Sequence, residues 1–373
     1  MDKHLHIVSF DVPLPANYGG VIDVFYKIVW LHKLNIKIHL HCYTSGREKN
    51  TLLNQYCQSV HYYKRVKKWP ARFLSTPYIV QSRSDIKLLK TLQQDDFPVL
   101  FEGIHCTYLL HKNLLPGRKV FVRLHNVEHR YYHWLGKHEI NFFKKIYFIW
   151  ESRLLKKYEK KLANKAVFFC LSKQDVSFYR SVFKAQNIHF TPAFLPWENT
   201  KTQPGKGCFC LYHGNLSINE NEKAADWLMN EVFNTLQIPL VIAGRNPSLP
   251  LQTLAQSQSH TCMIVNPGDD EMQDLIKKAQ INILPSFNNT GIKLKVLNAL
   301  YNGRHCLVNN AAVKGADIDE LCTLAETAAT FKAQVATLFQ QEITEGELLM
   351  RAENLKNVYS NDRNAMQLIA WIY

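Results

Sequence analysis

The chain has 373 residues, 46% hydrophobic and 20% charged, which is typical of a globular protein with room for two domains. No uncharged apolar run approaches the roughly 20 residues that span a bilayer, and the start, "MDKHLHIVSF", predicts a strand rather than a secretory signal. Residues 1–190 hold 31 Lys+Arg against 13 Asp+Glu, whereas the remainder holds 14 against 18. We therefore expect the first half to favour an anionic surface; a generally basic surface is the alternative.

Strand-like and helix-like segments alternate along the chain. The first half has a helix pattern at 19–34, and strand patterns at 4–12, 37–44, 99–104, 119–126 and 165–172. The second half has strand patterns at 208–214, 239–244, 262–267, 281–286 and 305–310. Such alternation predicts an α/β protein with two doubly wound parallel sheets. The Pro- and Gly-rich stretch 190–207 predicts the boundary, and the Pro-free stretch 344–373 predicts a helix.

The segment "LPSFNNTGIKLKVLNALYNG", residues 284–303, runs from a strand through a loop into a helix. Thr290 or Asn289 is the expected N-cap, and Gly291 lets the backbone approach a ligand closely. Lys293 and Lys295 lie in the first turns, where a helix already carries partial positive charge. A bound diphosphate would explain cations at that end; a solvent-facing lysine pair is the alternative.

Other strand ends also carry candidate ligand contacts, because ligands bind outside the carboxyl ends of parallel strands. Gly19 and Gly20 open a helix after the first strand, although the chain has neither GxGxxG nor a P-loop. Gly214 and Gly244 each follow a strand, and Arg245 is a further phosphate candidate. The backbone at 265–267 is a candidate contact for a nucleobase. The acidic run 269–271 starts a helix, where carboxylates are favourable without a metal.

"FVRLHNVEHRYYHWLG", residues 121–136, gathers polar groups at another strand end, and this favours a sugar or acceptor site. No HExxH occurs, so a zinc site is not favoured. Residues 141–162 combine aromatic side chains with lysine pairs, which is typical of a membrane-surface helix; a core helix with a solvated basic face is the alternative. Residues 64–73 hold five more cations, four of them in 64–68, ahead of the aromatic side chains.

Together, the glycine pair at 19–20, "RLHNVEH", "HGNLS", "VIAGRNP" and "LPSFNNTGIKLKVLNALYNG" resemble, in order and spacing, motifs of the GT-B glycosyltransferases. The resemblance is specifically to the retaining family-4-type group, glycosyltransferase group 1, and covers essentially the full length. It implies two Rossmann-like domains facing each other across a cleft. The expected domains are an acceptor domain at 1–195, a nucleotide-sugar domain at 196–345 and a C-terminal helix at 346–373 that returns to the first domain.

The resemblance also assigns roles to residues. His125 falls at the family's cleft histidine, which contacts the transferred sugar, and is the expected catalytic residue. The family's paired glutamates fall at Thr290 and Asn298, and its phosphate-binding lysine falls at Glu220. The family's glycine-arginine-leucine turn reads Gly214-Asn215-Leu216, so its arginine is absent too. Lys293 and Lys295 are expected to replace these two cations, helped by Arg245. The expected donor-binding residues are Gly19, Gly20, Gly214, Asn215, Gly244, Arg245, Val265, Asn266, Pro267, Thr290, Gly291, Ile292, Lys293, Lys295 and Asn298. The expected acceptor-binding residues are Arg123, Asn126, Glu128, His129 and Arg130.

The expected reaction transfers a hexose, with retention, from a UDP- or GDP-sugar to a saccharide or lipid-linked saccharide acceptor in envelope polysaccharide biosynthesis. No cofactor is expected, and no strict requirement for a metal. The expected location is cytoplasmic, at the inner face of the cell membrane, with the basic first domain towards anionic lipid. No nucleic-acid-binding module accompanies the charge. Two alternatives stay open: a non-catalytic GT-B protein that binds glycan or a partner, and a nucleotide-sugar epimerase.

Overall fold

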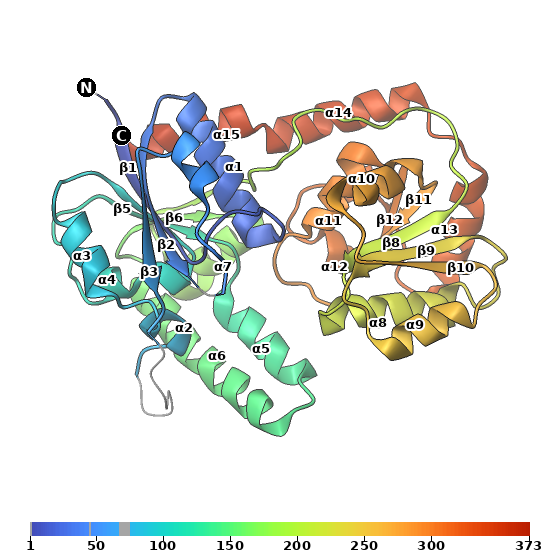
Figure 1. The fold of residues 1–373 in the computed structure, drawn as a ribbon, viewed down its shortest axis with the longest axis horizontal. Coiled ribbons are helices and arrows are strands. Elements are labelled where there is room, and N and C mark those ends of the chain that lie inside the picture. Colours follow the sequence, from blue (N-terminus) through green and yellow to red (C-terminus); the bar gives the residue numbers. More distant parts are fainter. Residues whose placement is uncertain (1, 45, 67–74) are drawn as a thin grey trace. The chain divides into compact units, whose positions relative to one another are not determined.

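The computed structural model describes residues 2–44, 46–66 and 75–373 (Figure 1). Most of the basic segment 64–73 lies outside these ranges. The chain forms two compact units, the first from Met1–Pro196 with Tyr359–Tyr373 and the second from Trp197–Val358. The first change of unit falls inside the Pro- and Gly-rich stretch 190–207. Each unit is an α/β layer structure around a parallel sheet, as the alternating pattern predicts.

The first unit is built on a seven-stranded sheet with the order β3-β2-β1-β4-β5-β6-β7, in which all registered pairs are parallel. The order reverses between β1 and β4, the place where doubly wound sheets bind ligands. The sequence patterns miss β3, a half-exposed edge strand, and β7, which has only three residues. The strands are β1 His4–Ser9, β2 Lys37–Thr44, β3 Ser59–Lys64, β4 Val99–Glu102, β5 Val120–Leu124, β6 Val167–Cys170 and β7 Ile188–Phe190.

Helices cover both faces of this sheet and bury a core on each. One core contains Ile28 from α1 and Leu368 from α15, and Trp371 stacks on Phe169 with ring centroids 5.2 Å apart. The opposite core contains Leu88 from α3 and Leu155 from α6. The chain's last helix therefore completes the first unit. The helices are α1 Gly19–Lys33, α2 Tyr78–Gln81, α3 Ile86–Leu92, α4 Tyr108–His111, α5 Glu128–His138, α6 Phe142–Leu162, α7 Lys173–Phe183 and α15 Asn361–Ile372.

Five histidines share one face of the first three strands. His6 and His41 are joined by a 2.8 Å hydrogen bond, and His6 also lies 3.0 Å from Asp95. His41 in turn reaches the Tyr63 hydroxyl at 3.0 Å and stacks on His61. The set is His4, His6, His39, His41 and His61. Burial lowers the pKa of His6, His41 and His61 and lowers that of His39 to about 4, despite the nearby Asp95 carboxylate.

Acid is therefore expected to destabilise the first unit. The four histidines whose pKa is lowered stay neutral in the folded protein while the unfolded chain takes up protons below pH 6.5, so their contribution to stability is complete above that pH and falls between 6.5 and about 4. Each extra proton bound by the unfolded chain costs up to about 1.4 kcal/mol per pH unit. Urea unfolding at pH 7.5 and 5 measures this slope.

A variant pair isolates the histidine contribution from that of the other titrating groups. His41 lies at the buried centre of the five histidines, so His41→Gln is expected to weaken the dependence of stability on pH. The change His133→Gln, at an exposed histidine, is expected to leave that dependence unchanged. Asp95 and Arg118, which are ion-paired at 2.7 Å beside His6, are retained in both variants. Equal slopes for His41→Gln and the parent chain would contradict the assignment.

The second unit is built on a six-stranded parallel sheet with the order β10-β9-β8-β11-β12-β13, so its switch point lies between β8 and β11. The strands are β8 Cys210–Asn215, β9 Leu240–Arg245, β10 Thr261–Val265, β11 Ile281–Ile283, β12 His305–Val308 and β13 Thr323–Leu324. The helices are α8 Asn219–Trp227, α9 Leu249–Gln256, α10 Asp269–Lys278, α11 Leu294–Asn302, α12 Asn310–Val313, α13 Ala328–Gln340 and α14 Glu345–Tyr359.

The single helix expected over 346–373 is two helices. α14 ends at Tyr359, and Ser360 caps α15 by accepting the amide of Arg363. Only the second helix packs in the first unit, where the Asn361 side chain binds both the amide and the carbonyl of Leu195 at 3.0 and 2.8 Å. Among the described residues, no helix is both long enough and apolar enough to cross a membrane.

Candidate functional site

In the second unit, the predicted donor residues on three strands gather at one edge of the sheet. The parallel register places Gly214 beside Gly244, and Gly244 beside Val265, at the carboxyl ends of β8, β9 and β10. A Cβ on Gly244 would overlap the Gly214 carbonyl oxygen and the Leu216 side chain, so this glycine allows two strand ends to approach closely. Asn215 and Arg245 are register partners directly after them.

The loop after β11 lies on the other side of β8, because these two strands are neighbours in the sheet. Asn288 shapes this loop by accepting hydrogen bonds from the amide and the hydroxyl of Thr290, at 2.9 and 2.7 Å. The expected capping by Thr290 or Asn289 is wrong: α11 begins at Leu294, and its N-cap is Lys293, which makes no side-chain capping bond. Gly291 adopts φ +70°, a conformation that glycine tolerates best.

Three backbone amides just before α11 are available to donate hydrogen bonds to a ligand. Within the described ranges, the amides of Gly291, Ile292 and Lys293 have no hydrogen-bond acceptor. Unpaired amides at a helix start carry partial positive charge and bind anions well. The loop after β11 thus offers three adjacent donors at the switch point of the sheet.

The two lysines of α11 face the start of α8. The Lys293 ammonium lies 3.5 Å from the Glu220 carboxylate and donates to the Thr290 carbonyl at 3.0 Å. Lys295 donates to Asn221 at 3.1 Å and to the Tyr212 hydroxyl at 3.2 Å. Burial lowers the pKa of Lys295 to about 8, although Glu220 opposes the shift, and burial also lowers the pKa of Lys293. Two cations and one carboxylate leave this group with a net positive charge.

Glu220 was predicted only as the position where a phosphate-binding lysine is missing. In the structure it also accepts hydrogen bonds from Ser286 at 2.7 Å and Asn288 at 3.2 Å, and so holds the loop after β11. Where the resemblance places a lysine on α8, this chain has Glu220, and the neighbouring cation, Lys293, lies at the start of α11 instead. Sequence spacing gives no sign of the pairing with Lys293, because contact between the two helix starts depends on the order β8-β11 in the sheet.

Three further donor candidates are partly engaged elsewhere. Arg245 pairs with Asp269 at 3.1 Å, but both side chains are exposed, so the pair is weak and the guanidinium can rearrange. Asn298 accepts a hydrogen bond from Asn302 on the next helical turn at 2.8 Å. Asn266 has φ +53° and accepts a hydrogen bond from the Asn246 amide, which shapes the turn before Pro267.

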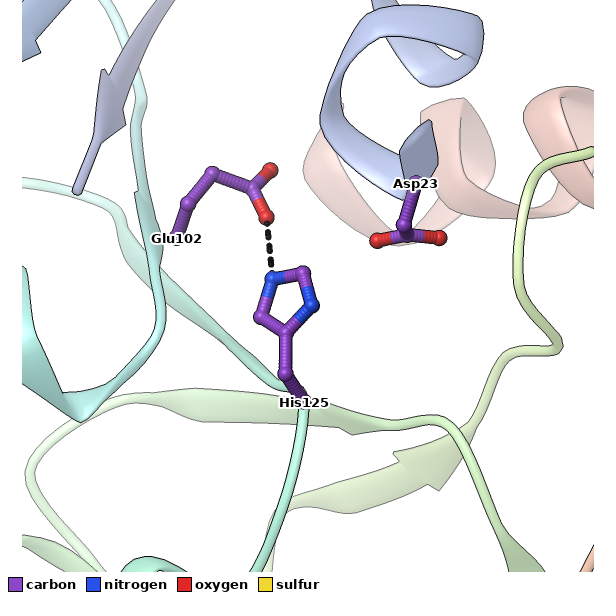
Figure 2. Close-up of side chains that lie close together, drawn as sticks. All are labelled: Asp23, Glu102 and His125. Atoms are coloured by element: carbon purple, nitrogen blue, oxygen red, sulfur yellow. Dashed lines mark hydrogen bonds and ion pairs between the residues drawn. The ribbon is translucent and has the colours of Figure 1, made fainter. Parts of the chain in front are cut away.

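In the first unit, His125 belongs to a buried group of charged side chains at the ends of β4 and β5. Its Nε2 lies 3.1 Å from Glu102, as Figure 2 shows together with Asp23 from α1. Glu102 lies 2.8 Å from Lys27, which also pairs with Asp23 at 3.0 Å. Because a carboxylate only accepts hydrogen bonds, Glu102 places the His125 hydrogen on Nε2 and leaves Nδ1 as an acceptor, which has no partner among the described residues.

Arg123 completes this group instead of facing a ligand. It is 1% exposed and grips Asp23 with two nitrogens, at 2.9 and 3.1 Å. It also donates to the carbonyls of Thr191 and Pro192 at 2.6 and 2.8 Å. Burial alone would raise the pKa of Asp23, but Arg123 and Lys27 outweigh it and hold the pKa well below its usual range. The predicted acceptor-binding role of Arg123 is therefore replaced by a structural one.

Asp23, Glu102 and His125 each place a ligand atom within 4.8 Å of the others, a spacing that could hold a metal ion. The positive charge at this place is already supplied by Lys27 and Arg123, which balance the two carboxylates. The donor set therefore fits a salt-bridge network better than a cation site.

The remaining acceptor candidates lie at the start of α5. His129 is buried and contacts Glu159 at 2.5 Å, and Glu159 also accepts the amide of Glu128 at 2.9 Å. Burial, followed by Glu159, raises the pKa of Glu128 to about 8, while a hydrogen bond from Asn126 opposes the shift. Arg130 lies over the Phe178 ring, 3.7 Å from its centroid. These side chains chiefly anchor α5, and none of their contacts in the structure points to a ligand.

The predicted glycine pair begins α1 in the same unit. Gly19 is the first residue of the helix, and Tyr18 before it makes no side-chain cap. A Cβ on Gly20 would lie 2.8 Å from the Phe10 ring, so Gly20 lets α1 pack against the loop after β1. The Phe10 ring also meets His125 edge-on, with centroids 5.5 Å apart. The first strand's loop and His125 thus belong to one local cluster.

Residues 208–341 match the family model "Glycosyl transferases group 1". A relative from Klebsiella pneumoniae, described as an uncharacterized 44.6 kDa protein in the cps region, is 29% identical over 318 residues, covering 79% of this chain and 80% of that protein. Sucrose-phosphate synthase of Thermosynechococcus elongatus is similar in structure, with a TM-score of 0.71, 12% identity and coverage of 99% and 98%. HepE of Anabaena, solved in complex with UDP and glucose, has a TM-score of 0.63, 11% identity and coverage of 100% and 99%.

Proposed function

We propose that this chain, a glycosyltransferase with the GT-B fold and a group 1 domain, moves a hexose from a UDP- or GDP-sugar to a saccharide or lipid-linked saccharide acceptor. The single observation that carries the proposal is a group of positive donors in the second unit, which we call the anion site. It consists of the backbone amides of Gly291, Ile292 and Lys293 and the neighbouring ammonium groups of Lys293 and Lys295. A pyrophosphate there would be bound by backbone donors and by an excess of positive charge.

The same site supplies the chemistry of transfer. The leaving group is a nucleoside diphosphate, and negative charge grows on its phosphate as the bond to the sugar breaks. Preorganised amides and an ammonium group stabilise that charge more in the transition state than in the bound donor. His125, held by Glu102, is the proposed residue that positions the transferred sugar. Retention of configuration is proposed from the resemblance to the family-4-type group.

The setting is proposed from the relative in Klebsiella pneumoniae, whose description places it in a cps region. That relative favours polysaccharide biosynthesis at the envelope as the context of this chain. HepE, solved with UDP and glucose, supports a nucleotide-sugar donor of the same kind. We propose that no cofactor or metal is needed, and that the enzyme works on the cytoplasmic face of the cell membrane.

The test is a panel of UDP- and GDP-hexoses incubated with the chain, with and without an extract of lipid-linked saccharides. Release of nucleoside diphosphate that depends on the acceptor is the expected result, with sugar recovered in the acceptor fraction. Conversion of one donor into its epimer without acceptor would replace the proposal by the epimerase alternative. Nucleotide binding without any turnover across the panel would leave only a binding role.

A further inference from the structure

The hairpin of α5 and α6 ends in an exposed apolar tip. The two helices pack side by side in the first unit, and the turn between them lies at the end of the hairpin (Figure 1). Ile140 is 87% exposed, Phe142 67%, Phe143 78% and Ile146 51%. Contiguous exposed apolar side chains on a water-soluble surface mark an interaction site. We call these four residues, with Asn141 between them, the hairpin tip.

The hairpin tip is held in a defined shape. Asn141 caps α6 by accepting the Lys144 amide at 3.1 Å, and its own amide is held by Glu139 at 2.9 Å. Gly136 packs so closely on α6 that a Cβ there would lie 2.8 Å from Ile149. Further along α6, the side chains of Leu155 and Leu162 are buried in the core. The expectation of a membrane-surface helix over all of 141–162 is therefore wrong for the second half of that segment, and the exposed apolar surface is confined to its start.

Cations surround the hairpin tip. Lys137, Lys144 and Lys145 are exposed, whereas Glu139, the acidic residue nearest to the turn, accepts the Asn141 amide. Exposed apolar side chains with exposed lysines next to them in the chain match the boundary between acyl chains and anionic headgroups. Four side chains are too few for a protein interface, which typically buries about 800 Å² per partner. Charge and size together favour a lipid surface over a protein.

We propose that the hairpin tip inserts into the headgroup region of an anionic phospholipid bilayer, with the two phenylalanines among the acyl chains and Lys144 and Lys145 at the phosphates. This lipid-binding proposal rests on the proposed function only for its biological setting, in which the hairpin tip is the surface through which the enzyme reaches a lipid-linked acceptor. Binding itself requires no turnover, so the two proposals can fail separately.

The test is co-sedimentation of the full chain with vesicles of phosphatidylcholine alone and of phosphatidylcholine mixed with an equal part of phosphatidylglycerol. The chain is expected to bind the mixed vesicles more strongly. Phe142→Ser with Phe143→Ser is expected to weaken that binding at least about tenfold, because two aromatic side chains lose their apolar burial. Lys144→Gln is expected to weaken it about fivefold, and only on the anionic vesicles.

The matched control is Leu249→Ser in the second unit, because Leu249 is 77% exposed but lies far along the chain from the hairpin tip. It is expected to bind vesicles like the parent chain. Circular dichroism and sedimentation velocity check that each variant is folded and report its oligomeric state. Vesicle binding that survives the double serine change, or no binding by the parent chain, would overturn the proposal. So would a dimer of the parent chain that the serine changes dissociate, since the hairpin tip would then join two copies.

The transfer assay separates this result from the proposed function. Loss of vesicle binding in the serine variant, with full transfer to a water-soluble saccharide acceptor, is the pattern expected when both proposals hold. Vesicle binding by a chain that is inactive on every donor would contradict the proposed function and leave the hairpin tip as a lipid-binding element.

Discussion

Arg123→Met is expected to destabilise the first unit by about 3–5 kcal/mol, the usual cost of removing one partner from a buried ion pair. The change removes both bonds to Asp23 and both bonds to the carbonyls of Thr191 and Pro192. Lys27 remains, but it is shared between Asp23 and Glu102. Because small domains are stable by only about 5–15 kcal/mol, much of this unit's stability would be lost. Urea unfolding with hydrogen exchange of peptides from α1 and β5 measures the effect.

Two comparisons identify the buried charge as the cause. Adding Asp23→Asn to Arg123→Met is expected to restore part of the lost stability, since no uncompensated carboxylate remains. Lys278→Met, which breaks the exposed pair with Asp274 in α10, is expected to cost less than about 1 kcal/mol. An Arg123→Met protein as stable as the parent would show that the network contributes little.

Lys293→Met is expected to weaken the binding of UDP or GDP by about 10- to 100-fold. A hydrogen bond to a charged group is worth about 1.5–3 kcal/mol, and 1.4 kcal/mol corresponds to a factor of ten in affinity. Lys293 suits this test because its nearest carboxylate is 3.5 Å away and its side chain is partly exposed. Lys295 lies deeper, and its removal would leave Asn221 and Tyr212 without a partner. Isothermal titration calorimetry with each nucleotide gives the affinities.

A change of opposite sign provides the control for Lys293. Glu220→Gln keeps an acceptor for Ser286 but gives up the bond from Asn288. Because the change removes the negative charge beside Lys293, nucleotide binding is expected to become tighter. Lys278→Met removes a cation from the same unit away from the site and is expected to change nothing. If Lys293→Met and the parent chain bind nucleotide equally, the anion site does not hold the donor phosphates.

Much of the fold can be predicted from the sequence, because buried parallel strands leave a strong local signal. The apolar runs around Leu5, Leu40 and Leu211 form the strands β1, β2 and β8, as predicted. Their alternation with helices is what gives the two-sheet fold shared with the similar structures. β3 and β7 gave no comparable signal: one lies half-exposed and the other is three residues long. The break at Ser360 was also missed, since a capping serine within an otherwise helical pattern is a weak sign of a new helix.

The candidate site was less predictable, because its contacts join residues distant in the chain. The gathering of Gly214, Gly244 and Val265 follows from the rule that parallel strands end at one edge. The pairing of Glu220 with Lys293, and of Asp23 with Arg123 across 100 positions, depends on strand order and helix rotation that no local pattern encodes. A charged residue at a strand end has the same sequence pattern whether it binds a substrate or a buried carboxylate, so the pattern predicts a ligand contact for Arg123 where the structure has an ion pair.

The helix α15 has a consequence for how this protein is made. Asn361 binds Leu195, which lies 166 positions earlier in the chain, and Ala365, Leu368 and Ile372 belong to the same core as α1. While the ribosome is still synthesising the second unit, the first unit therefore has apolar surface uncovered over Leu5 and Ile28. The core of the amino-terminal half can therefore close fully only after residues 361–372 have been synthesised. A product that ends before residue 361 would thus have all seven strands of the first sheet but would lack the helix that packs in one of its two cores.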